Sequence, residues 1–272
     1  TDSVVANGGD GIGINAGSGA VTIGGVTADE RNVISGNALH GVHMETSGGH
    51  TIVGNYIGLA ADGSTDRGNV MDGVLINNSN TNTVGGGTAG ERNVISGNNL
   101  HGVELTGTST GNLTRGNYIG TDAGGTLDRG NSSDGVHIDA ADGNTIGGTG
   151  DNHRNVISGN NSDGVELITN SDNNSILNNY IGTDASGTAD LGNTAHGIRL
   201  DGNNNTIGAP GPGGGQGNVI SGNGQNGIDI QAISTGNTVF TNRVGVGSDG
   251  FTAVGNGFNG VRIQGNSDNN QI

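Results

Sequence analysis

One internal repeat constrains the fold of this chain more than any other feature. The heptapeptide RNVISGN occurs three times and the variant GNVISGN once, starting at Arg31, Arg92, Arg154 and Gly217. GNYIG or NNYIG segments lie between these copies and divide each repeat into two similar halves. Motifs that recur at a nearly constant spacing along a chain indicate a solenoid, in which every unit buries its apolar face against the next unit.

Each half of the repeat contains three short apolar segments separated by turns rich in glycine and asparagine. The first segment is of the NTIG type, the second is NVI or NYI, and the third is GV followed by a polar residue and Ile or Leu. Three short strands per coil, stacked in parallel on the equivalent strands of adjacent coils, form a parallel β-helix. Because parallel crossovers are almost always right-handed, we predict an all-β, single-stranded right-handed parallel β-helix. It has about eight to nine coils and forms one solenoid over residues 1–272.

The composition agrees with a repetitive β-fold. The chain has 59 glycines among 272 residues, two prolines and 29% hydrophobic residues. Collagen is excluded because glycine has no three-residue period. Aliphatic residues recur at fixed positions and predict core columns, and asparagine recurs in two columns. These are Asn32, Asn55, Asn93, Asn117, Asn155, Asn179, Asn218 and Asn242, and then Asn82, Asn112, Asn144, Asn174, Asn205, Asn237 and Asn270. We expect stacked amides there to bond one another between coils.

The NVISGN, DGVxI and NTIGG segments resemble the right-handed parallel β-helix repeats of the pectate-lyase-like superfamily. More narrowly, their succession is similar to repeats of large bacterial secreted and surface proteins. The resemblance covers almost the whole chain and implies the fold and an extracellular or cell-surface location. That superfamily includes lyases, hydrolases, epimerases, adhesins and phage tailspikes, so the fold alone does not assign an activity. No segment matches the catalytic motifs of its polygalacturonases, pectate lyases or mannuronan epimerases.

The charge and hydropathy of the chain exclude several classes of partner. The net charge of −16 argues against nucleic acid as a partner. No stretch approaches the roughly 18 apolar residues of a membrane span, so we expect no membrane insertion. The chain starts without Met and stops inside a repeat, and we expect it to be a piece of a longer protein. Unpaired strands at both ends predict end-to-end self-association.

A strip of titratable residues on the third segments is the main candidate site. Its outward positions, from Glu104 onward, alternate acid and base, and a second column precedes each segment. Ligand-binding candidates on the strip are His101, Glu104, His137, Glu166, His196 and Arg199, and the residues that an enzyme would use are Glu104, Asp134, His137, Asp163, Glu166 and Arg199. A charge ladder that stabilises stacking is the structural explanation of this alternation. Acid-base cleavage of a polysaccharide needs the same groups.

Two further features are candidates for ligand binding. Tyrosines occur on every second coil and suit sugar stacking, although each precedes a long loop under which it can pack: Tyr56, Tyr118 and Tyr180. Loop aspartates are candidates for calcium, with solvated turns as the alternative: Asp122, Asp128, Asp184 and Asp190.

Because the coils stay similar throughout, we expect a non-enzymatic extracellular stalk, adhesin or carbohydrate-binding surface that needs no cofactor. Its expected partner is a carbohydrate or cell-surface polymer. The alternative is a polysaccharide lyase, epimerase or glycoside hydrolase that uses the strip.

Overall fold

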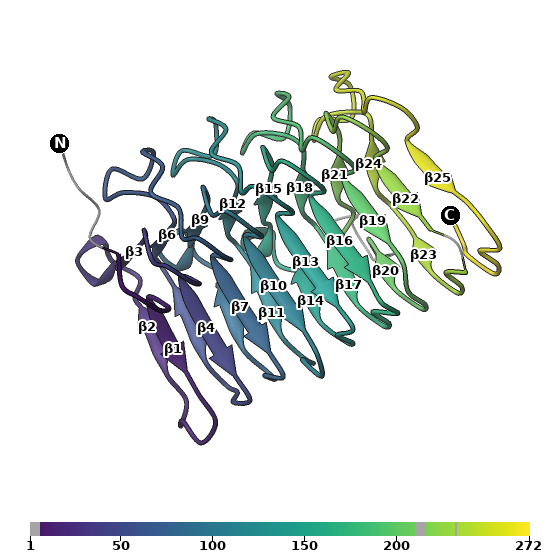
Figure 1. Ribbon diagram of the computed structural model, residues 1–272. Helices are drawn as coiled ribbons and strands as arrows, with labels where there is room; N and C mark the ends of the chain where they lie inside the picture. The colour runs from purple at the N-terminus through teal and green to yellow at the C-terminus, as the bar shows by residue number, and fades with distance from the viewer. Residues whose placement is uncertain (1–5, 210–215, 232) are drawn as a thin grey trace.

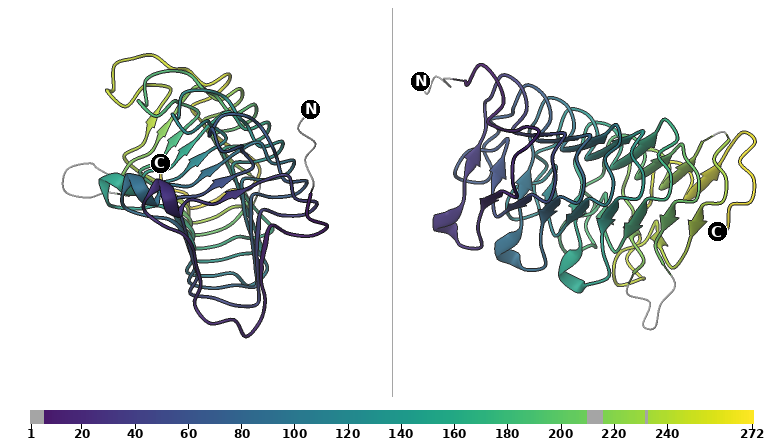
Figure 2. Two further views of the ribbon diagram at one scale, coloured as in Figure 1. Left: turned by 90° about the vertical axis from the view of Figure 1, so that its left-hand side faces the viewer. Right: turned by 90° about the horizontal axis from the view of Figure 1, so that it is seen from below.

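The structure is a computed structural model that describes residues 6–209, 216–231 and 233–272. The chain winds as a right-handed parallel β-helix, with three sheets that run along the whole solenoid (Figure 1). Viewed nearly along the axis, successive coils superpose, and loops project from them (Figure 2). The predicted fold class is confirmed.

Sheet A contains the third segments of the repeat and carries the candidate site. Within the described residues it has nine strands, in the order β1 (Ile12–Ile14), β4 (Val42–Glu45), β7 (Val74–Asn77), β10 (Val103–Thr106), β13 (Val136–Asp139), β16 (Val165–Ile168), β19 (Ile198–Leu200), β22 (Ile228–Ile230) and β25 (Val261–Ile263). All neighbouring pairs are parallel, and equivalent residues of successive coils are in register, as Glu104 is with His137.

Sheet B contains the first segments and sheet C the second segments. In the described part of the chain, sheet B has eight strands, which are β2 (Thr22–Gly24), β5 (Thr51–Val53), β8 (Thr83–Gly85), β11 (Leu113–Arg115), β14 (Thr145–Gly147), β17 (Ser175–Leu177), β20 (Thr206–Ile207) and β23 (Thr238–Val239). Sheet C also has eight there, which are β3 (Val33–Ile34), β6 (Tyr56–Ile57), β9 (Val94–Ile95), β12 (Tyr118–Ile119), β15 (Val156–Ile157), β18 (Tyr180–Ile181), β21 (Val219–Ile220) and β24 (Arg243–Val244).

Two kinds of insertion leave the coils at different edges. Long loops between sheets C and A each contain one antiparallel bridge, as between Thr121 and Asp128, and follow one another in a row (Figure 1). Short 3-10 helices lie between sheets B and C in a second row (Figure 2). These are η1 (Ala28–Glu30), η2 (Ala89–Glu91) and η3 (Asp151–His153). The insertions therefore form two separate rows along the solenoid.

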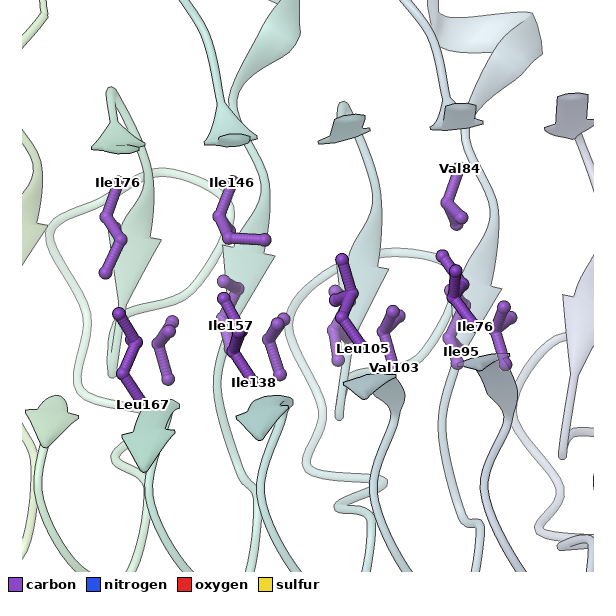
Figure 3. Close-up of a cluster of buried hydrophobic side chains, with 14 of the residues drawn as sticks. Ile76, Val84, Ile95, Val103, Leu105, Ile138, Ile146, Ile157, Leu167 and Ile176 are labelled. Carbon is purple, nitrogen blue, oxygen red and sulfur yellow. The ribbon is translucent and has the colours of Figure 1, made fainter. Parts of the chain in front are cut away.

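The core consists of stacked aliphatic columns from all three sheets (Figure 3). Because parallel strands keep every residue in register with its equivalent, a residue that faces inward on one coil faces inward on all of them. One inward-facing position of the sheet B column is polar rather than aliphatic. Thr114 occupies a fully buried place between Val84 and Ile146 in the sheet B column, and its Oγ1 has no hydrogen-bond partner.

Both predicted asparagine ladders form. Asn117, for example, donates from Nδ2 to Asn155 Oδ1 at 3.2 Å and accepts from Asn93 Nδ2 at 3.0 Å. The structure adds a third ladder that the sequence analysis missed, at the final asparagine of ISGN and in the loop segment before sheet A: Asn37, Asn69, Asn98, Asn131, Asn160, Asn193, Asn223 and Asn256. Three asparagine ladders therefore connect adjacent coils by hydrogen bonds at the turns between the sheets.

The outermost strands of each sheet have a partner on one side only within the described residues. End-to-end self-association stays a prediction. In the part of the chain that the structure describes, no helix is long and apolar enough to cross a membrane.

Candidate functional site

The candidate site is the titratable strip, which consists of two adjacent columns on the outer side of sheet A. The strand column contains the outward residue of each strand, namely Gly13, His43, Leu75, Glu104, His137, Glu166, Arg199, Asp229 and Arg262. The preceding column contains the residue before the glycine that opens each strand, namely Asp10, His40, Asp72, His101, Asp134, Asp163, His196, Asn226 and Asn259. Both columns run straight along the solenoid because all these strands pair in register.

The preceding column forms a ladder of its own. Each aspartate side chain accepts the backbone N–H of the equivalent residue on the next coil, as Asp72 Oδ1 does from His101 at 2.9 Å and Asp134 Oδ1 from Asp163 at 2.8 Å. Histidine reaches the next coil through Nδ1, which in His101 lies 3.1 Å from the Asp134 carboxylate. These aspartates and histidines therefore connect coils, which is the role that asparagine has at the corners.

Asp134 is the centre of the densest charge cluster. Its Oδ2 lies 3.1 Å from His101 Nδ1 and 3.2 Å from His137 Nδ1, and the side chain is almost completely buried. Burial alone would raise the pKa of Asp134, but the hydrogen bonds with His101 and His137 outweigh it and hold the pKa well below its usual range. Asp134 is therefore a fixed negative charge beneath two imidazole rings.

His137 is held as a cation. Its Nδ1 also lies 3.0 Å from Glu166 Oε2, so that two carboxylates share one imidazole nitrogen. Burial opposes the charged form, but the bonds to Asp134 and Glu166 dominate and raise the pKa of His137 to about 10. The strip thus contains an imidazolium at neutral pH.

Two carboxyl groups beside this cluster have pKa values near neutrality. Burial, together with the neighbouring Asp72 carboxylate, raises the pKa of Glu104 to about 7. Burial raises the pKa of Asp163 to about 7 as well, and the charges of Asp134 and Glu166 add to this effect. Asp163 is buried, whereas Glu104 is only partly buried. Glu104 is therefore the near-neutral carboxyl that a ligand can reach more easily.

The predicted site residues on the strip come together to different degrees. Glu166 forms an ion pair with Arg199, whose side chain remains 39% exposed, and the alternation continues in the pair of Asp229 and Arg262. His196 lies on the coil of Arg199, 3.7 Å from Asp229 through Nε2, and burial lowers its pKa. Seven of the predicted residues, Asp134 included, thus belong to one cluster, and His196 belongs to the next.

Two groups on the strip have the side chains for a metal ion. His101, Asp134 and His137 offer ligand atoms within 4.8 Å of one another, as do Asp134, Asp163 and Glu166. The first set has the nitrogen and oxygen donors that transition metals accept, and the second has only oxygen donors. Both sets share Asp134, so a single cation would reorganise the whole cluster.

The loop aspartates lie away from the strip and cap their own turns. Asp122 Oδ1 accepts the N–H groups of Thr126 and Leu127, and Asp184 Oδ1 those of Ser186 and Ala189. Asp128 and Asp190 each accept the N–H two residues further on, at Gly130 and Gly192. In the described part of the chain, these aspartates form no group of three metal-ligating side chains. Calcium at Asp122, Asp128, Asp184 and Asp190 stays a prediction.

The three tyrosines lie on the outer side of sheet C and pack beneath the long loops. A Cβ on Gly125 of the loop would lie 2.8 Å from Tyr118 Cε2, and Gly63 and Gly187 approach Tyr56 and Tyr180 in the same way. The rings also have a second contact, which the sequence analysis missed. An arginine stacks on each tyrosine with Cζ at 4.2, 4.0 or 4.3 Å from the centroid, in the pairs Arg31 and Tyr56, Arg92 and Tyr118, and Arg154 and Tyr180.

A signal for these pairs was present in the sequence. Each RNVISGN motif opens with the arginine, and each GNYIG or NNYIG motif on the next coil places a tyrosine one residue beyond the equivalent asparagine. Sheet C pairs each tyrosine with the valine two residues after the arginine, so the register brings the two side chains near each other and the structure shows that they stack.

Comparison with known proteins gives no family for the chain. No protein-family model matches it, and no curated protein sequence matches it. Solved structures with a similar chain path include a variant of the periplasmic alginate epimerase AlgG, at 17% identity and a TM-score of 0.46 over 83% of this chain and 47% of that chain. Wild-type AlgG has 16% identity and a TM-score of 0.43, over 86% and 44%. DFA-IIIase from Arthrobacter chlorophenolicus A6 has 16% identity and a TM-score of 0.39, over 85% and 55%.

This chain spans about half the length of these proteins. Their activities are properties of those proteins.

Proposed function

We propose that this protein is a polysaccharide-active enzyme whose acid-base groups lie on the titratable strip around Asp134. One observation carries the proposal: Glu104, partly exposed and with its pKa raised to about 7, lies on the strand next to the imidazolium of His137. A proton-transfer group is most effective when its pKa is close to the working pH. Perturbed titratable groups that cluster at one place are typical of functional sites.

The chemistry that fits these groups is proton abstraction from a uronic acid unit. In the proposed step Glu104 takes the proton at C5, and the electron pair delocalises onto the adjacent carboxylate group. His137 and Arg199 supply the positive charge that stabilises this dianion. In elimination the pair then forms the C4–C5 double bond while the C4–O4 bond breaks, and the leaving oxygen takes the proton that Glu104 carries. In epimerisation C5 takes a proton from water on its opposite face, and the proton on Glu104 neutralises the hydroxide that remains.

Both outcomes begin with the same proton transfer, so one experiment tests them together. The protein is incubated with polygalacturonate, alginate and a neutral glucan in deuterated water. Unsaturated uronates report elimination, deuterium at C5 reports epimerisation, and new reducing ends without unsaturation report hydrolysis. We expect one of the first two signals on an acidic substrate and none on the glucan.

Matched variants separate the Asp134 cluster from the rest of sheet A. Glu104→Gln and Arg199→Gln should reduce the rate by at least about 100-fold. Glu45→Gln and Arg262→Gln change the same residue types on sheet A outside the Asp134 cluster, and they should keep most of the activity. Absence of product from every substrate, or equal loss in the control variants, would overturn the proposal.

A second candidate function rests on the ladder of the preceding column. Asp72, Asp134 and Asp163 each accept a backbone N–H from the next coil, so these carboxylates have a structural use. On this basis the protein is a non-enzymatic stalk or adhesin that binds carbohydrate at an extracellular surface. Binding of a polysaccharide without product, unchanged in Glu104→Gln, would favour this second candidate.

A further inference from the structure

We infer that sheet C carries a second binding surface, which takes the carboxylate groups of an extended acidic polysaccharide. We call it the arginine–tyrosine row and define it by Arg31 with Tyr56, Arg92 with Tyr118, Arg154 with Tyr180, and Arg243. The row belongs to a different sheet from the titratable strip. The inference therefore does not rest on the proposed function.

Three of the four guanidinium groups of the row, those of Arg31, Arg92 and Arg154, stack on a tyrosine ring. Arg92 lies over the ring of Tyr118, which is also in close contact with the loop glycine Gly125 at a position where φ is +69° and a side chain would collide. Arg31 is fixed further by a hydrogen bond from Nε to Gly54 O at 3.1 Å, and Arg154 by one from Nη2 to Asn178 Oδ1 at 2.9 Å. A preorganised planar guanidinium binds a carboxylate at a low cost in side-chain entropy.

Cavities open between successive members of the row. One of about 140 Å³ lies between Arg92 with Tyr118 and Arg154, and Ala185 of the long loop forms part of its wall. The next, of about 120 Å³, lies between Arg154 with Tyr180 and Arg243, and Ser248 of the following loop lines it. Asp151 lines both cavities. Each cavity is therefore lined by two arginines, one tyrosine and a single acidic residue, Asp151.

The arginines of the row form no ion pair within the described residues, although Asp151 lines the same cavities. Within the described residues, no carboxylate oxygen comes within 4.0 Å of the guanidinium nitrogens of Arg92, Arg154 or Arg243, although the protein has a net charge of −16. The nearby Glu91 instead accepts the N–H of Gly87 at 2.9 Å and the hydroxyl of Thr88. The Nε atoms of Arg92 and Arg154 are buried and have no hydrogen-bond partner. Such orphan donors are costly, and an anion in the cavity would complete the site.

The spacing of the row selects an extended polymer rather than a single anion. Members recur every second coil, which corresponds to about 9.6 Å at the spacing of parallel strands. This is comparable to the length of one disaccharide in an extended polysaccharide. Carboxylates of alternate sugar units would thus meet successive cavities, while the exposed edges of the Arg and Tyr pairs contact the sugar rings.

The test uses oligogalacturonates of defined length as the probe, with binding measured by calorimetry. We expect the affinity to rise from the dimer to the hexamer, because longer chains reach more cavities, and to fall with added salt. The methyl-esterified hexamer, which has the same shape without the charges, should bind at least tenfold more weakly. No binding of any acidic oligomer to the parent protein would overturn the inference.

Variants locate the binding on sheet C. Arg154→Gln removes a guanidinium from two cavities and should weaken the hexamer at least tenfold, whereas Arg67→Gln removes the same charge from an exposed loop and should leave binding unchanged. If Arg154→Gln does not fold, as judged by circular dichroism, the exposed Arg243→Gln replaces it. Unchanged affinity in the folded row variant would refute the site. Glu104→Gln should keep full affinity, so failure of the proposed enzyme and failure of this surface are separate results.

Discussion

The imidazole rings of His101 and His137 stack on consecutive coils of sheet A, with their centroids 4.2 Å apart and their planes at 20°. Both Nδ1 atoms turn toward the same Asp134 oxygen. This arrangement concentrates charge at one place in a solenoid whose coils otherwise repeat closely. The charge cluster makes the stability of the protein depend on pH, and buried polar groups of the core contribute to stability independently of it.

The stability that His137 contributes should depend on pH. Its pKa is about 10 in the folded protein and 6.5 for the free residue, so the contribution is complete below about pH 6.5 and is lost as the pH rises to about 10. The difference in the free energy of unfolding between the parent and His137→Gln, measured in urea, should shrink over this range. His153→Gln serves as the control, because the pKa of His153 is lowered and its titration lies below this window. A constant difference for His137→Gln would contradict the assignment.

Glu104→Gln should stabilise the protein at pH 8. The pKa of Glu104 is about 7 in the folded protein and 4.5 for the free residue, so the folded state binds the proton more tightly and stability falls as the pH rises from about 4.5 to 7. Glutamine removes this cost, and we expect a melting temperature higher by a few degrees at pH 8 and little changed at pH 4.5. The matched Glu45→Gln should not be stabilised, since a hydrogen bond from Thr46 lowers the pKa of Glu45. Equal shifts of the melting temperature in both variants would contradict this prediction.

Asn117→Ala should be strongly destabilising. The fully buried amide donates to Val84 O at 2.9 Å and to Asn155, and it accepts from Asn93, so alanine leaves several buried polar groups without partners. We expect a loss of about 2–4 kcal/mol in the free energy of unfolding by denaturant titration. Asn99→Ala, at an exposed position one residue beyond a ladder asparagine, should cost less than about 0.5 kcal/mol. Similar losses at both sites would show that the ladder adds nothing to stability.

Thr114→Val should stabilise the protein. The substitution keeps the shape of the side chain and removes a buried hydroxyl that has no hydrogen-bond partner. The expected gain is about 1 kcal/mol, measured as a higher denaturant midpoint with an unchanged slope. Thr110→Val, at an exposed position nearby, provides the comparison. A destabilised Thr114→Val would mean that the hydroxyl has a partner in solution, such as a buried water.

The sequence by itself determined the fold, the register and the content of each column. The repeat of RNVISGN places Ile95 and Ile157 on equivalent coils, and parallel pairing then turns every column of the alignment into a column in space. For the same reason the pairing of Glu104 with His137, and of Glu166 with Arg199, followed from the spacing alone. A solenoid makes such contacts predictable, because each coil touches only its neighbours.

Only the tertiary structure decided how neighbouring columns interact. Whether Asp134 reaches both His101 and His137, and whether Arg92 lies over Tyr118, depends on how side chains of two columns lean toward each other across the sheet surface or around a corner. Periodicity fixes which residues are stacked, but it contains no distance between one column and the next. Burial of Glu104 and the resulting shift of its pKa depend on those distances, and so does the chemistry of the site.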